Sequence, residues 1–371
     1  MTDPRLYVTR PALPALDEFI PLLQEIWASR ILTNGGPFHA RLESALCEYL
    51  GVPHVSLCTN ATLGLMIALR SACPPGEIIT TPYSFVATSH VIRWTGSEPV
   101  FVDVEPDTLN IDASRVEAAI TPRTTGILAV HCYGNPCAVT ELEALAERHG
   151  IPLVYDAAHA FGARVHQRSL MSYGDLSVVS FHATKIFNTL EGGAIVCKDA
   201  ATKLKIDRLK NFGFVNETSI AECGLNAKMS EINAALGLLQ LKTMPDILER
   251  RADIGLKYRL ELQDVVGIDC ITPGPHTVWN HAYFPIMVRE TFGMSRDALY
   301  EKMKQAGVHC RRYFHPLISD LEMYRSLPSA DPARLPVASA AGNQVLCLPI
   351  YPDLSPDDQS RVIALIRGDA D

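Results

Sequence analysis

The sequence predicts an α/β protein with a mixed sheet, and two observations carry this prediction. In the first two thirds of the 371-residue chain, short apolar segments rich in β-branched residues alternate with helix-like segments. This alternation is typical of a sheet that is covered by helices on both faces. In addition, only nine residues, 183–191, separate the last two predicted strands, whereas a parallel crossover needs about a dozen or more. The last strand should therefore run antiparallel to its predecessor or lie at a distance from it.

Each predicted strand is a short apolar run bounded by turn residues. The seven strands are Val55–Thr59, Glu77–Thr81, Pro99–Val104, Thr125–His131, Pro152–Ala157, Leu176–His182 and Gly192–Cys197. The helices predicted between them include Thr62–Ala72, Asp112–Ile120 and Thr140–His149.

The segment after the sheet predicts two consecutive helices. Apolar residues recur at helical spacing over Ser230–Thr243, and Ser230 is a suitable N-cap. Pro245 should end this helix, because proline lacks an N–H and clashes with the preceding turn. A second helix should then cover about Asp246–Gln263.

The character of the chain changes after Gly267, where strands become shorter and loops richer in proline. A strand is predicted at Tyr283–Val288 and a helix at Arg296–Gln305. We therefore predict a large domain over residues 1–245 and a smaller α+β domain over residues 246–371.

Composition excludes several classes of protein. Lys and Arg total 33 and Asp and Glu total 41, giving a net charge of −8, which argues against a dedicated nucleic-acid binder. No apolar run is long enough to cross a bilayer, and the N-terminus lacks the apolar core of a signal peptide. The ten cysteines are scattered without C-x-x-C spacing, so we expect reduced thiols in a cytoplasmic protein and no metal site.

Ligands of open α/β sheets bind outside the carboxyl ends of the strands, so the residues after each strand are the candidates. Ala61 and Thr62 open a helix whose free N–H groups can bind an anion, although Asn60 on its own reads as an ordinary helix cap. Phe85 follows the next strand and can stack on a flat ring, although on its own it reads as a core aromatic.

Two later strands end in chemically active residues. Asp156 follows a buried apolar run, where a carboxylate needs a partner such as a cation, a metal or a protonated ring nitrogen. The alternative is a helix cap, with His159 an ordinary buried histidine. Lys185 lies in a short loop after Ser180, where its pKa can be lowered as an imine-forming lysine requires. Alone, it could equally be a surface lysine in a hairpin loop.

The order of these elements is more informative than any one of them. An anion site, an aromatic residue, a strand-end Asp and a Ser-x-x-x-x-Lys segment follow one another along the chain. Pyridoxal phosphate needs an anion site, a cover for its ring, an acid at its pyridine nitrogen and a lysine that forms an imine. The sequence therefore predicts a pyridoxal phosphate site.

The chain also resembles the DegT/StrS family of sugar aminotransferases, which have the aspartate-aminotransferase-like fold (fold type I). The resemblance runs over nearly the whole length. Its motifs are residues 101–112, Asp156-Ala-Ala-His159, Ser180-Phe-His-Ala-Thr-Lys185, Glu191-Gly-Gly193 and residues 224–235. It implies a mixed seven-stranded sheet with helices on both faces and a smaller C-terminal domain.

The resemblance also implies roles for individual residues. Lys185 would bond the cofactor, Asp156 would pair with the pyridine nitrogen, and Phe85 would cover the ring. Ala61, Thr62 and Ser180 would bind the phosphate, and His159, where the family often has Gln, would contact the ring hydroxyl. Further implied residues are Asn226, which would reach the phosphate of the neighbouring subunit in a homodimer, and, near the sugar, Thr33, Asn34, Gly36, Tyr313 and His315.

The implied reaction is transfer of the amino group of L-glutamate to a dTDP-linked keto sugar. The loop Leu32–Phe38 and the His-Ala-Thr-Lys motif most resemble enzymes that aminate carbon 4 of dTDP-4-dehydro-6-deoxyglucose, with amination at carbon 3 as the runner-up. A sugar dehydratase of this fold would carry histidine in place of Lys185, and a non-catalytic sensor would lack Lys185 or Asp156. The product could serve a surface polysaccharide such as an O-antigen or a natural product.

Overall fold

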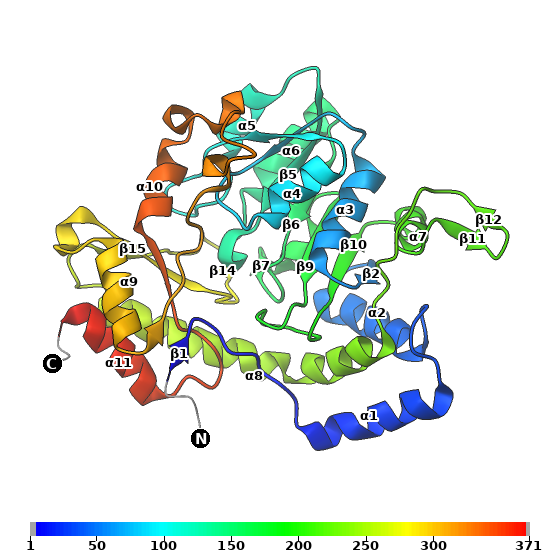
Figure 1. The fold of residues 1–371 in the computed structure, drawn as a ribbon, viewed down its shortest axis with the longest axis horizontal. Helices are drawn as coiled ribbons and strands as arrows, with labels where there is room; N and C mark the ends of the chain where they lie inside the picture. The colour runs from blue at the N-terminus through cyan, green and yellow to red at the C-terminus, as the bar shows by residue number, and fades with distance from the viewer. Residues whose placement is uncertain (1–4, 369–371) are drawn as a thin grey trace.

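The computed structural model describes residues 5–368 and is built around a seven-stranded sheet (Figure 1). The strands lie in the order β2-β10-β9-β6-β5-β3-β4. Their bounds are β2 (His54–Cys58), β3 (Glu77–Thr80), β4 (Glu98–Phe101), β5 (Thr124–Val130), β6 (Leu153–Asp156), β9 (Leu176–Ser180) and β10 (Gly193–Cys197). Each overlaps one of the seven strands predicted from the sequence.

Strand β10 runs antiparallel to both of its neighbours, whereas the remaining pairs in the sheet are parallel. The mixed sheet is therefore confirmed, and the last strand lies directly beside its predecessor. Gly193 of β10 is paired with Ser180 of β9. The loop that joins them, with Lys185, consequently lies at the carboxyl end of β9.

Helices cover both faces of the sheet (Figure 1). They are α2 (Pro37–Leu50), α3 (Ala61–Ala72), α4 (Ala87–Trp94), α5 (Ala113–Ala119), α6 (Val139–His149) and α7 (Ala200–Leu209), with α1 (Leu16–Ser29) at the periphery. Side chains on both faces of the strands are buried, as the unbroken apolar runs predict. The side chain of Asn60 accepts a hydrogen bond of 2.9 Å from the N–H of Leu63 and so caps α3.

The prediction of two helices separated at Pro245 is wrong. A single helix, α8, spans Glu231–Leu262 and contains Pro245 in its interior. In Figure 1 this helix extends along the base of the molecule, and it packs against α1, α2 and the C-terminal helix α11 (Pro356–Arg367). An interior proline costs about 3 kcal/mol, and contacts along both halves of the helix offset this cost. Ser230 caps the helix as predicted, accepting from the N–H of Asn233.

The remaining elements form a second, smaller layer. Strands β13 (Ile268–Cys270), β15 (Phe284–Val288) and β17 (Val345–Leu348) make a three-stranded antiparallel sheet, packed with α9 (Arg296–Gln305) and α11. The predicted limits of the two domains stay a prediction, and residue 245 lies inside a continuous helix. The other elements are β1 (Leu6–Tyr7), β7 (Arg164–Val165), β8 (Arg168–Ser169), β11 (Phe214–Asn216), β12 (Ser219–Ile220), β14 (Thr277–Val278), β16 (Val308–His309) and α10 (Pro336–Gln344).

No helix within residues 5–368 has both the length and the apolar character needed to cross a bilayer. All ten cysteines are free thiols in the structure.

Candidate active site

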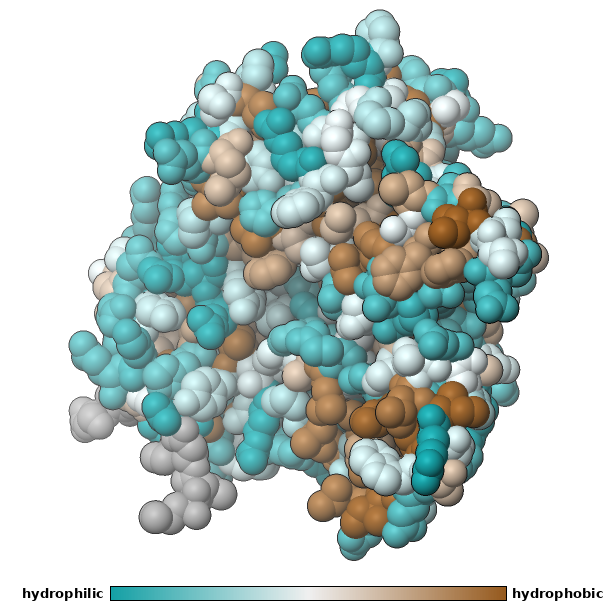
Figure 2. Space-filling model, turned by 45° about the vertical axis from the view of Figure 1, so that its right-hand side comes forward, coloured by the Kyte–Doolittle hydropathy of each residue, from teal (hydrophilic) through white to brown (hydrophobic). Residues whose placement is uncertain are grey.

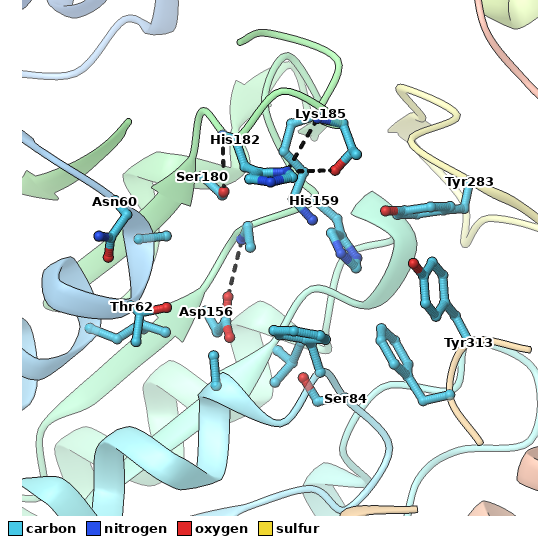
Figure 3. A pocket seen from close by; sticks show the side chains of 18 of the residues that line it. Asn60, Thr62, Ser84, Asp156, His159, Ser180, His182, Lys185, Tyr283 and Tyr313 are labelled. Atoms are coloured by element: carbon cyan, nitrogen blue, oxygen red, sulfur yellow. Dashed lines mark hydrogen bonds between the residues drawn. The ribbon is translucent and has the colours of Figure 1, made fainter. Parts of the chain in front are cut away.

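A cavity of about 360 Å³ lies at the carboxyl ends of β6 and β9 and beside the start of α3 (Figure 3). Eight residues predicted from the sequence line it: Ala61, Thr62, Phe85, Asp156, His159, Ser180, Lys185 and Tyr313. They come from segments spread over some 250 residues of the chain. The parallel strands bring all of them except Tyr313 together, because the carboxyl ends of these strands share one edge of the sheet.

Asp156 is the last residue of β6, and only 5% of it is exposed. One carboxylate oxygen accepts a hydrogen bond of 2.7 Å from the hydroxyl of Thr88, and the other accepts one of 3.1 Å from the N–H of Ala158. Burial raises the pKa of this carboxyl, while those two bonds and the charge of Lys185 act in the opposite direction. A buried carboxylate of this kind is stabilised by a cationic partner.

Lys185 is partly buried in the loop between β9 and β10. Loss of hydration around its ammonium group lowers its pKa to about 8, although the negative charge of Asp156 acts in the opposite direction. Its Nζ lies 5.9 Å from the ring centroid of Tyr283. In weakly alkaline solution, a large fraction of a lysine with this pKa is unprotonated and can act as a nucleophile or base.

The start of α3 faces the cavity together with two hydroxyl groups, those of Thr62 and Ser180. The backbone N–H groups in the first turn of a helix have no partners within the helix, and the helix dipole favours an anion there. Gly193 lets β10 pass close to this turn. A Cβ atom at Gly193 would lie 2.8 Å from the backbone nitrogen of Ala61, which is too close for any other residue.

His159 is buried, and its Nδ1 atom accepts a hydrogen bond of 3.2 Å from the backbone N–H of Tyr133. Burial and the nearby charge of Lys185 hold the pKa of the imidazole well below its usual value. His159 is therefore neutral and faces the cavity, rather than serving as an isolated core histidine.

Aromatic side chains form the wall opposite Asn60 and Thr62 (Figure 3). Tyr283 and Tyr313 lie there with their rings edge to face at 5.4 Å, and Phe314, which also lines the cavity, stacks on Tyr313 with ring centroids 5.5 Å apart. Phe85 also lines the cavity with 58% of its surface exposed, so its interpretation as a core aromatic is wrong.

Sequence reasoning missed several lining residues. Tyr283 gave no local signal, because only tertiary contacts bring it to the cavity, and Phe314 lies in a segment expected near the substrate but had no role of its own. His182, Thr184 and Glu191 lie within the recognised motifs but had no assigned role. The hydroxyl pair Ser84–Thr88, 2.7 Å apart, connects to Asp156 through Thr88, and its spacing of four residues at the start of α4 was the available signal.

The remaining predicted residues do not line this cavity. Thr33 and Asn34 are exposed in the loop before α2, Gly36 precedes that helix, and Asn226 is exposed. The carboxylate of Glu231 at the start of α8 accepts from the N–H groups of Phe38 (2.7 Å) and His39 (2.9 Å) at the other end of the Thr33–Gly36 loop. His315 is exposed next to the aromatic wall. Their roles in binding stay predictions.

The donor set of the cavity fits pyridoxal phosphate. The first turn of α3, with Thr62 and Ser180, would hold the phosphate, and Phe85 would lie over the ring. Asp156, which has only neutral hydrogen-bond donors in the structure, would pair with the protonated pyridine nitrogen. Within residues 5–368, no cluster of three or more His, Cys, Asp or Glu side chains is arranged to hold a metal ion.

Comparison with known proteins identifies a family and a relative in Escherichia coli. The sequence profile of the DegT/DnrJ/EryC1/StrS aminotransferase family matches residues 15–367. A protein of Escherichia coli named dTDP-4-amino-4,6-dideoxy-D-glucose transaminase is 48% identical over 371 residues, covering 99% of this chain and 100% of that protein.

Two solved structures are similar over almost the whole chain. The crystal structure of DesI in the presence of its TDP-sugar product has a TM-score of 0.94 and 40% identity, covering 99% of this chain and 93% of that one. Helicobacter pylori PseC, an aminotransferase involved in pseudoaminic acid biosynthesis, has a TM-score of 0.91 and 27% identity, covering 98% of both chains.

Proposed function

The chain belongs to the DegT/DnrJ/EryC1/StrS aminotransferase family, and from this premise we propose its reaction. It transfers the amino group of L-glutamate to dTDP-4-dehydro-6-deoxyglucose and forms dTDP-4-amino-4,6-dideoxyglucose, with pyridoxal phosphate as cofactor. The observation that best supports pyridoxal phosphate as the cofactor is that Asp156 and Lys185 line one cavity beside the N-terminus of α3. The sugar is supported by the names of the E. coli relative and of DesI with its TDP-sugar product.

The residues of the chain divide the work of this reaction. Bound pyridoxal phosphate supplies an electron-accepting ring and a carbon that carries the amino group. Lys185 holds the cofactor through Nζ, and its amine, when free, takes the proton from the α-carbon of L-glutamate. The lowered pKa leaves much of this amine unprotonated near pH 8.

Asp156 and the aromatic wall act on the same cavity in different ways. The carboxylate of Asp156 keeps a proton on the pyridine nitrogen and is itself held by Thr88 and the N–H of Ala158. Tyr283, Tyr313 and Phe314 limit the access of water on the opposite side. Thr33, Asn34, Gly36 and His315 are proposed to meet the sugar nucleotide.

We further propose that the enzyme is a homodimer, with Asn226 of each chain reaching the cofactor phosphate of the other. Helix α1 supports this, because Leu16 (67%) and Trp27 (66%) are largely exposed on its surface. Apolar surface gathers on the side of the molecule where α1 and α2 lie (Figure 2), and such patches mark interaction sites. The ten free cysteines support a reducing, cytoplasmic location.

The proposal is tested by trapping the cofactor and following each half of the reaction. The purified protein with pyridoxal phosphate should absorb visible light, and L-glutamate should change that absorbance. Borohydride reduction followed by peptide mapping should place the cofactor on Lys185. Label on another lysine would contradict the site, and an unchanged spectrum with L-glutamate would contradict the donor.

A further inference from the structure

The turn after β5 brings the backbone of Tyr133 against His159. Tyr133 has a left-handed backbone with φ of 57°, which a tyrosine rarely adopts. In this conformation its N–H donates to His159 Nδ1 at 3.2 Å. Both side chains are buried, so this bond is shielded from water.

This hydrogen bond fixes the tautomer of the imidazole. A ring nitrogen that accepts a hydrogen bond carries no proton, so in the neutral ring the proton must be on Nε2. Within the described part of the chain Nε2 has no hydrogen-bond partner, although only 8% of His159 is exposed and the ring lines the cavity. The titratable groups that face the ring are Lys185, Tyr133 and Tyr283, and Lys185 favours the neutral state.

The side chain of Tyr133 is anchored by residues from two other segments. Its hydroxyl pairs with that of Tyr83 at 2.7 Å and donates to the backbone carbonyl of Tyr313. Its own carbonyl accepts a hydrogen bond of 2.9 Å from Trp279 Nε1. The strained turn is therefore held by hydrogen bonds to Tyr83, to Tyr313 of the aromatic wall and to Trp279.

Asn280 holds the backbone around His159 in place. Its side-chain amide donates to the carbonyls of His159 (2.7 Å) and Phe161 (2.9 Å). Gly134 makes room for it, since a Cβ atom there would lie 2.2 Å from Asn280 Oδ1 and 2.7 Å from the His159 carbonyl. The two turns are thus locked together around the imidazole.

We propose that Tyr133 is a positioning residue for His159, fixing a neutral imidazole with its proton on Nε2 so that it donates a hydrogen bond into the cavity. The backbone N–H selects the tautomer, and the hydroxyl holds the turn that aims this N–H. The proposal rests on the proposed function only for what Nε2 meets, an acceptor oxygen of the bound cofactor. The tautomer is a property of the chain alone and can be measured without the cofactor.

The test uses cofactor-free protein labelled with ¹⁵N-histidine and long-range proton–nitrogen correlation spectra, with the signals assigned by H159Q. In spectra recorded from about pH 6 to about pH 9, the wild-type ring should show the neutral Nε2–H form throughout. In Y133F the anchoring hydroxyl is lost, and the tautomer ratio should shift at least about five-fold toward Nδ1–H.

Two further variants keep the result interpretable. Y283F removes a hydroxyl whose ring packs edge to face on the same imidazole without a hydrogen bond to it in the described structure, and should leave the tautomer unchanged. Y83F removes one partner of Tyr133 while leaving the bond to the Tyr313 carbonyl, and should shift the tautomer ratio in the same direction as Y133F but by less. It provides the test if Y133F folds poorly. A cationic or Nδ1–H ring in the wild type, or a Y133F spectrum identical to it, would overturn the proposal. Because no cofactor is present, neither result depends on transamination.

Discussion

The two walls of the cavity are built in different ways. One wall consists of strand ends and a helix start and carries Asp156, Ser180, Lys185 and Thr62. The other consists of aromatic rings from irregular segments, among them Tyr283. The first wall holds charges and hydrogen-bond donors whose positions follow from the register of β6 and β9. The second is held by contacts between residues distant in sequence, such as the bond from Tyr133 to the carbonyl of residue 313.

The two walls therefore have different proposed tasks: the polar wall takes part in the chemistry, and the aromatic wall encloses the cavity. Changes in the polar wall should remove steps of the reaction, because the proposed mechanism gives each group there a distinct chemical role. Changes in the aromatic wall should alter binding more modestly, because several rings share the contact area.

Replacing Lys185 by alanine should have the largest effect. In the proposed mechanism K185A lacks both the group that holds the cofactor and the proton-transferring amine, so amino transfer should fall by at least about 10³-fold. The rate of the absorbance change with L-glutamate measures this loss. K198A is the matched control, because Lys198 is exposed beyond the other end of β10 and pairs with Glu143. Equal loss in both variants would remove the special role of residue 185.

The carboxylate of Asp156 comes next. D156N keeps the size of the side chain but removes its charge, and the rate with L-glutamate should fall by about 10²–10³-fold. D175N serves as the control, since Asp175 accepts from the N–H of Leu153 at the opposite end of the sheet and should retain nearly full activity. A wild-type rate in D156N would contradict the role of the charge.

The pH dependence of Lys185 labelling provides a third test. The pKa is lowered from 10.5 to about 8 by burial, and only the unprotonated amine reacts with acylating reagents. In cofactor-free protein, labelling of Lys185 should therefore rise with pH and reach its midpoint near pH 8. In D156N the midpoint should move lower, because the negative charge that favours the ammonium is gone. Mass spectrometry of the labelled peptide measures both, and a midpoint near 10.5 would show a hydrated lysine.

The smallest effect is expected at the aromatic cover. F85L should weaken cofactor binding by about three- to ten-fold, because stacking contributes about 0.5–1.5 kcal/mol beyond area burial. Fluorescence titration of the cofactor-free protein measures this affinity. W94L is the control, since Trp94 is 78% exposed at the end of α4 and does not line the cavity. If F85L lowered the rate with L-glutamate by more than D156N does, the expected order of effects at the two walls would be contradicted.

The fold was predictable where local pattern and packing agree. The seven strands and the antiparallel β10 follow from apolar runs and from one short connection. The break at Pro245 was wrong because tertiary contacts along α8 outweigh the local cost of a proline. No local pattern reports such contacts.

The same limit applies to the site. The positions of Asp156 and Lys185 were predictable because each lies at or shortly after the end of a recognisable strand and within a motif. Tyr283 and Tyr133 were not, because their roles depend on rings and carbonyls far away in the sequence. Phe85 was ambiguous in sequence, because an aromatic residue in a core and one on a cavity wall have the same local pattern.

The most direct test of the central claim follows the nitrogen atom. The enzyme is incubated with pyridoxal phosphate, L-[¹⁵N]glutamate and dTDP-4-dehydro-6-deoxyglucose, and the product is examined by NMR. The account predicts ¹⁵N bonded to carbon 4 of the sugar, with 2-oxoglutarate formed in equal amount. A sugar without ¹⁵N, or with ¹⁵N on carbon 3, would contradict it.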